Sequence, residues 1–201
     1  MKAIHAIAAI ATVTVMISFP SCNKSGTAGR IADSTLIKPI EEMQKRGQDL
    51  RNKSDFEGAI ATHDSCIKAA TDIHDTIQLV IALNNQGTNF RRLGDLKEAS
   101  DLHYRALEIS DAYSDKVSPV ARKNHVRSLN GLGNILMSLN NNDAAIGFFR
   151  QALAGETALG SATGQAINLA NIGSIKEKEG ERDSARVYYN MSMEKNREAE
   201  N

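Results

Sequence analysis

Small residues recur along this sequence at a fixed spacing, and that spacing restricts the possible folds more than any other feature. A glycine returns at intervals of 40, 46 and 40 residues, and an alanine follows each glycine by twelve residues. The glycines are Gly47, Gly87, Gly133 and Gly173, and the alanines are Ala59, Ala99, Ala145 and Ala185. A period of this length indicates a repeat architecture, in which one supersecondary unit stacks on the next. We therefore expect four copies of one unit.

Apolar and small residues around each pair follow a helical spacing. A large apolar residue stands four positions before each glycine, and a second small residue stands seven positions after each alanine. These residues are Met43, Leu83, Leu129 and Leu169, then Cys66, Ala106, Ala152 and Ser192. Spacings of three, four and seven place residues on one stripe of a helix. Because small side chains let two helix axes approach to roughly 8 Å, we expect each glycine to face an alanine on a second helix.

The turn signals fall between the expected helices. Gly94-Asp95 and Gly180-Glu181 stand where a first helix must stop and a second begin, and residues 140–142, all asparagine, do the same in the third unit. Ser118-Pro119 has the form of a helix N-cap followed by a first-turn proline. About eight helices are predicted.

The pattern resembles the tetratricopeptide repeat, in which two antiparallel helices per repeat carry small residues where they cross. The resemblance implies an all-α fold, a right-handed superhelical solenoid over residues 34–201, with repeats of roughly 36–75, 76–117, 118–160 and 161–201. Repeat spacings above 34 residues resemble the extended variants of the family. The polar residues from 194 to 201 suit a terminal helix that caps the stack.

The first 21 residues have the form of a signal peptide. Lys2 supplies one positive charge, residues 4–17 are almost entirely apolar, and the apolar run breaks at Ser18-Phe19-Pro20. A membrane-spanning helix needs about 20 apolar residues, so this run is too short to be one. We expect the mature chain to be exported.

Ser21-Cys22 and the polar residues after them resemble a bacterial lipoprotein signal, although Phe19 and Pro20 stand where that family prefers Leu and a small residue. The resemblance implies a lipid on Cys22, with residues 22–33 as a flexible tether. The expected location is a bacterial membrane, on its periplasmic or cell-surface side. Two or three acyl chains would make the anchor stable. The alternative is simple secretion with a free Cys22.

Charge and motifs exclude several functions. The 24 basic and 24 acidic residues are mixed along the chain, which argues against nucleic acid as a partner. His63 and Cys66 lie three apart on one predicted helix, but each occupies a packing slot of the repeat, and a zinc site needs three or four converging ligands. No hydrolase, zinc-protease, nucleotide-binding or kinase motif is present. We expect no enzyme activity, no metal and no cofactor.

In the solenoids that this chain resembles, the first helix of each repeat lines a concave groove. The resemblance assigns mainly amide and hydroxyl side chains to that groove: Gln44, Gln48, Asn84, Asn85, Thr88, Arg91, Asn130, Asn134, Asn171 and Ser174. Such groups can hydrogen-bond the main chain of an extended peptide, and Arg91 can contact a carboxylate. The alternative is that these polar residues only solvate an open face.

The predicted function is a membrane-anchored scaffold that binds a protein or peptide, of undetermined oligomeric state. One alternative is an accessory lipoprotein for nutrient capture, such as glycan binding, but glycan sites need exposed aromatic rings, and the chain has 4% aromatic residues and no Trp. A second alternative is a ligand-sensing protein. It could signal only through a separate partner, because no second apolar run follows the repeats.

Overall fold

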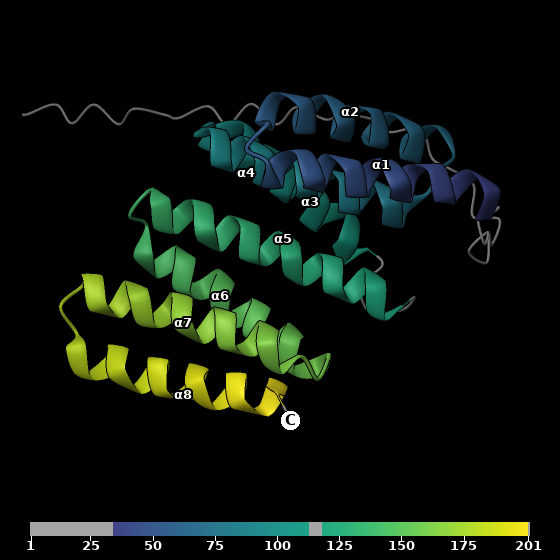
Figure 1. Ribbon diagram of the computed structural model, residues 1–201. Coiled ribbons are helices and arrows are strands. Elements are labelled where there is room, and N and C mark those ends of the chain that lie inside the picture. The colour runs from purple at the N-terminus through teal and green to yellow at the C-terminus, as the bar shows by residue number, and fades with distance from the viewer. Residues whose placement is uncertain (1–33, 113–117, 201) are drawn as a thin grey trace, which may run out of the picture. The chain divides into compact units, whose positions relative to one another are not determined.

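The computed structural model describes residues 34–112 and 118–200, and that part of the chain is entirely helical (Figure 1). The eight helices are α1 (Ser34–Asn52), α2 (Phe56–Asp72), α3 (Thr76–Leu93), α4 (Leu96–Asp111), α5 (Pro119–Ser138), α6 (Asn142–Ala158), α7 (Ala162–Lys178) and α8 (Arg182–Glu200). Each odd-numbered helix packs against the even-numbered helix that follows it, and each even-numbered helix packs against the next odd-numbered one. The predicted all-α repeat fold is confirmed.

The first three odd-numbered helices also pack against one another. α1 contacts α3 and α3 contacts α5, although a whole helix separates them in the sequence. We call α1, α3, α5 and α7 the inner helices and the even-numbered helices the outer helices. Because the first three inner helices lie side by side, side chains from three different repeats can meet on them.

One turn conformation joins most of the helices. A residue with positive φ follows the end of one helix, and the residue after it directly precedes the next helix. The positive-φ residues are Ser54, His74, Gly94, Asn140, Gly160 and Gly180. Asp55, Asp75, Asp95 and Ser161 follow four of them as N-caps whose side chains accept a backbone N–H. The predicted cap at Ser118, with Pro119 in the first turn, is also present.

The repeat glycines stand opposite rings rather than opposite alanines, which corrects the expected pairing. A Cβ added to Gly87 would lie 2.8 Å from the His103 ring, and one added to Gly133 would lie 2.7 Å from the Phe149 ring. Gly47 meets His63 and Gly173 meets Tyr189 in the same way. Each ring residue follows the repeat alanine by one helical turn. The glycine therefore makes room for the ring, and the buried alanine lies beside it.

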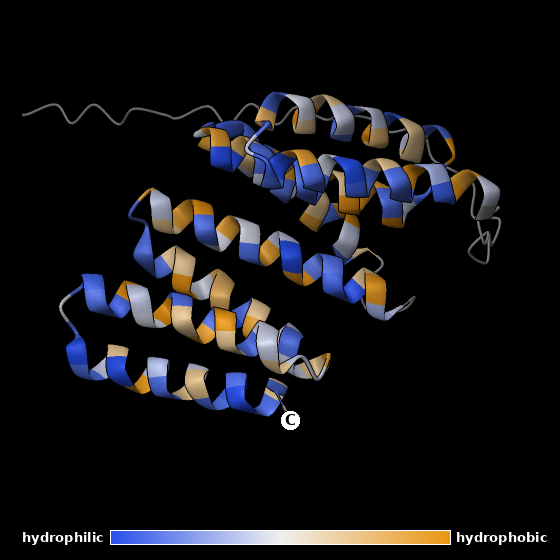
Figure 2. Cartoon of the chain, in the orientation of Figure 1, coloured by the Kyte–Doolittle hydropathy of each residue, from blue (hydrophilic) through white to orange (hydrophobic). Residues whose placement is uncertain are grey.

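Apolar side chains are buried between the helices, and Figure 2 shows hydrophobic and hydrophilic segments alternating along them. Leu83, Leu129 and Leu169, three of the predicted apolar positions, are at most 3% exposed. Within residues 34–112 and 118–200 we find no helix with the length and hydropathy of a membrane span. The predicted signal peptide (1–21), Cys22 and the tether (22–33) lie outside the described residues.

Candidate functional site

The predicted groove residues separate into two groups. Gln44, Asn84 and Asn85 are at most 4% exposed, so their expected position on an open face is wrong. The other seven are half-buried. The three buried amides differ because they point sideways at the neighbouring inner helix, where they meet polar groups of the next repeat.

Gln44 and Asn85 join the first repeat to the second. The Gln44 side-chain nitrogen donates to the main-chain oxygen of Gln78 at 3.2 Å, and Gln44 Oε1 accepts from Asn85 Nδ2 at 2.9 Å. A buried amide that kept no partner would cost stability, and these bonds supply partners for both residues. The pair therefore fixes how α1 lies against α3.

Asn84 joins the second repeat to the third. Its Nδ2 donates to the main-chain oxygen of Asn124 at 3.0 Å. Its Oδ1 lies 2.9 Å from His103 Nδ1 and accepts from the Ser128 hydroxyl at 3.0 Å. One buried side chain thus connects α3, α4 and α5.

The half-buried members lie on the inner helices, and three of their amides have no hydrogen-bond partner among the described residues. The side-chain amides of Gln48, Asn134 and Asn171 make no hydrogen bond to any residue in the described ranges. The Thr88 hydroxyl donates to the main-chain oxygen of Asn84 in its own helix. Asn130 and Ser174 are also half-buried, but the Asn130 side-chain oxygen is buried without a partner in the described ranges, and Ser174 hydrogen-bonds the Tyr189 side chain. We call Gln48, Thr88, Asn130, Asn134, Asn171 and Ser174 the inner polar row.

Arginines that the sequence analysis missed lie beside the buried amides. Arg127 of α5 donates from Nη2 to Asn85 Oδ1 at 2.9 Å. Arg51 of α1 donates from Nη1 to Asn89 Oδ1 at 3.2 Å and lies 3.4 Å from the main-chain oxygen of Asn85. Residues from the first and third repeats therefore meet on α3.

Burial and mutual repulsion both act on these arginines. Burial lowers the pKa of Arg51, and the charges of Arg127 and Arg92 lower it further. Burial also lowers the pKa of Arg127 and of the predicted groove residue Arg91. Arginine keeps its proton throughout the physiological range, so these groups remain cations. The inner helices therefore hold concentrated positive charge in a chain with no formal net charge.

One of these arginines had a signal in the sequence. Arg51 and Arg91 both stand four residues after their repeat glycine, so the register that selected Arg91 selects Arg51 as well. Arg127 had no such signal, because it precedes its glycine by six residues and the equivalent position in α3 is Ile81.

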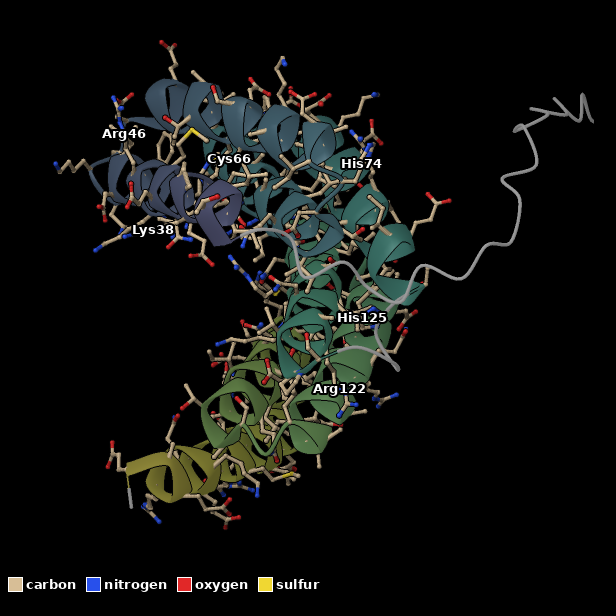
Figure 3. The ribbon with its side chains drawn as sticks, turned by 90° about the vertical axis from the view of Figure 1, so that its right-hand side faces the viewer. Lys38, Arg46, Cys66, His74, Arg122 and His125 are labelled. Carbon is tan, nitrogen blue, oxygen red and sulfur yellow. The ribbon has the colours of Figure 1, made fainter. Side chains whose placement is uncertain are left out.

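His63 and Cys66 are packing residues. Both have no exposed surface, and Cys66 (Figure 3) packs with Ile40, Ala70 and Ala82. Burial raises the pKa of the Cys66 thiol to about 11, which keeps it protonated and poorly nucleophilic. The described ranges contain no group of three or more residues that could hold a metal ion.

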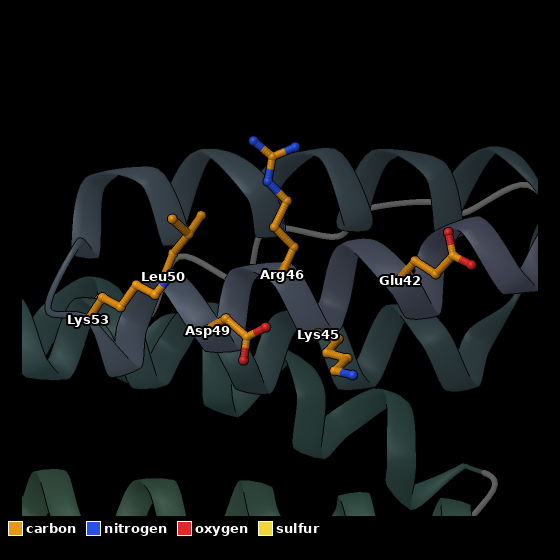
Figure 4. Close-up of a pocket in the computed structure, with 6 residues that line it drawn as sticks. All are labelled: Glu42, Lys45, Arg46, Asp49, Leu50 and Lys53. Atoms are coloured by element: carbon orange, nitrogen blue, oxygen red, sulfur yellow. The ribbon is translucent and has the colours of Figure 1, made fainter.

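A shallow hollow of about 360 Å³ lies along α1 (Figure 4). It is lined by Glu42, Lys45, Arg46, Asp49, Leu50 and Lys53. Five of these side chains belong to α1, Lys53 directly follows that helix, and most are charged with mixed signs. Because no second element supplies a wall, this hollow offers less to a ligand than the inner helices do.

The described part of the chain offers little for sugar stacking. Tyr104 and Phe148 form its one ring pair, with centroids 6.3 Å apart and planes at 74°. This edge-to-face arrangement presents no flat platform, so it gives no support to a glycan site.

Comparisons with known proteins agree with the repeat architecture. Two tetratricopeptide repeat models match residues 40–112 and 126–162, which together cover more than half of the 201 residues. The chain belongs to the tetratricopeptide repeat family. A search of curated proteins gives no match for this tetratricopeptide repeat chain.

Solved structures share its fold at low sequence identity. BtubC from P. vanneervenii superposes with a TM-score of 0.65 at 18% identity, over 82% of this chain and 72% of that one. Aspartyl phosphate phosphatase F from Bacillus subtilis gives 0.69 at 19% identity, over 82% and 42%. RapI in its apo form gives 0.64 at 15% identity, over 83% and 48%. The chain thus spans less than half the length of the last two, and the likeness concerns the fold alone.

Proposed function

We propose that this tetratricopeptide repeat chain is a non-catalytic scaffold that binds a protein or peptide partner along its inner helices. The observation that carries the proposal is the inner polar row, whose free amides stand on α1, α5 and α7. Amides both donate and accept hydrogen bonds, so they suit an extended main chain. Repeat stacks in general use such extended surfaces for binding.

The test uses a photo-crosslinking amino acid in place of Asn134 on α5, in cells that make the protein. The control places the same amino acid at Arg150, an exposed residue of α6 in the same repeat. We expect one discrete crosslinked species from position 134 and none from position 150. Equal crosslinking from both positions, or none from either, would contradict binding along the inner helices.

We propose further that the protein is exported and anchored in a membrane by a lipid on Cys22. The support is the sequence alone: a short apolar run followed by Ser21-Cys22. We expect acyl mass on a chain that begins at Cys22, and we expect a Cys22→Ala variant to leave the membrane fraction or remain uncleaved. An unmodified soluble wild-type chain would remove the anchor from the proposal and leave the scaffold.

A further inference from the structure

Two guanidinium groups from different repeats meet on one buried asparagine. Arg127 of α5 holds Asn85 Oδ1, and Arg51 of α1 approaches the main-chain oxygen of the same residue. Within residues 34–112 and 118–200, neither arginine has a carboxylate within ion-pair distance. Like charges held together away from water are costly unless an opposite charge compensates them. This part of the chain does not supply that charge.

The two side chains retain unused donors. A guanidinium carries five N–H donors, and the recorded bonds involve only Nη1 of Arg51 and Nη2 of Arg127. Both side chains are half-buried, so solvent reaches part of each. Exposed Arg92 on α3 is close enough for its charge to act on Arg51. We call Arg51, Arg92 and Arg127 the arginine cluster.

We propose that the arginine cluster binds carboxylates of an acidic segment in the partner, an inference that rests on the proposed scaffold function. Guanidinium groups match carboxylates in shape and bind them through paired hydrogen bonds. The three cations come from three helices, so they suit several carboxylates along a chain rather than one small ion. Thr88 and Asn134 lie on the same helices α3 and α5, where they can hold the main chain of that segment.

The probe is a fluorescent, unstructured peptide of alternating Asp and Gly, added to the full-length chain. Its counterpart with Asn in place of Asp and inorganic phosphate are the comparison ligands. We expect the Asp peptide to bind at least tenfold more tightly than the Asn peptide. Arg51→Gln and Arg127→Gln should each weaken it by about tenfold, because a hydrogen bond between charged groups is lost.

Arg46→Gln is the matched control. Arg46 also lies on α1 (Figure 3), but it is exposed and lines the shallow hollow along that helix. This variant should bind the Asp peptide like wild type. Melting followed by circular dichroism shows whether each variant folds.

Three results would overturn the inference: no binding of the Asp peptide, equal binding by Arg127→Gln and wild type, or phosphate binding as tightly as the peptide. The last would assign the cluster to a small oxyanion. If the Asp peptide does not bind while position 134 still crosslinks to a partner, the scaffold function stands and only the proposal of an acidic partner segment is wrong. If both experiments fail, both proposals fall.

Discussion

Gly133 and Gly147 lie in the same repeat, but a methyl group added to each would meet different surroundings. At Gly133 on α5 the new Cβ would stand 2.7 Å from the Phe149 ring, which has no exposed surface. At Gly147 on α6 nothing lies within 4 Å. Contacts of this kind, one per repeat, set how closely the two helices of a pair approach.

Gly133→Ala is therefore expected to lower the free energy of unfolding by about 1–3 kcal/mol through overpacking. Gly147→Ala is the control and should raise it by about 0.5–1 kcal/mol, because alanine favours a helix more than glycine does. Urea unfolding of both variants measures the difference. Equal effects at the two positions would show that the Phe149 ring is not held as described.

The buried histidines make a second prediction at this scale. Burial, with smaller effects of Arg51 and Arg127, lowers the pKa of His63 to about 4, so the folded chain holds this imidazole neutral. The unfolded chain takes up the proton near pH 6.5. The contribution of neutral His63 to the free energy of unfolding is therefore fully present above pH 6.5. It is lost as the pH falls toward 4, by about 2 kcal/mol at pH 5.

Replacement of His63 by Phe tests this, because Phe149 already occupies the equivalent slot of the third repeat. The variant should lose less stability than wild type between pH 7 and pH 5 in urea unfolding. At pH 7 it should be weaker by about 1 kcal/mol, since Asn89 Nδ2 loses the ring nitrogen 3.0 Å away.

At the scale of the helices, one residue with positive φ ends most of them. Gly94 holds φ +96°, which favours glycine, whereas Ser54 holds φ +63° at the corresponding turn of the first repeat. A side chain in this region costs roughly 1–2 kcal/mol. Glycine and serine thus form the same turn, but serine lowers the stability of the folded chain more than glycine does.

Gly94→Ala is expected to destabilise the chain by about 1–2 kcal/mol, while Ser54→Gly should stabilise it by up to about 1 kcal/mol. Nothing lies within 4 Å of a Cβ at Gly94, so the effect reports backbone conformation and not a clash. Thermal unfolding gives both values. If Ser54→Gly lowers the melting temperature, the turn is not held at positive φ there.

At the scale of the whole repeat stack, buried polar side chains decide how one repeat sits on the next. Asn84 bonds to Asn124 and Ser128 of α5 and contacts His103 of α4. In a linear stack each repeat contacts only its neighbours, so a lost contact is felt locally. The order of α3 to α5 therefore depends on Asn84 more than that of α7 and α8 does.

Asn84→Ala should cost about 2–3 kcal/mol, because several buried groups lose their partner. Hydrogen exchange should rise in α3, α4 and α5, with little change in α7 and α8. Asn190→Ala, at an exposed position of α8, is the control. A uniform rise along all eight helices would mean that the repeats unfold as one unit and not as neighbouring pairs.

The sequence by itself determined the helical hairpins, their number and most of their turns. Glycine and alanine at a fixed spacing define where two helices cross, and Ser118-Pro119 or Gly94-Asp95 define where helices begin, because these effects act within a few residues. Burial of Leu83 and Cys66 follows from the same helical stripe. This periodicity therefore predicts how the two helices of one repeat pack against each other.

Only the tertiary structure decided which inner residues meet across repeats. Gln44, Asn84 and Asn85 are buried because α1, α3 and α5 pack side by side, and Arg51 joins Arg127 only through that packing. The angle between successive repeats rotates a position either toward its neighbour or toward solvent. That angle results from the sum of ring, alanine and amide contacts between repeats, and no spacing within a single repeat encodes it.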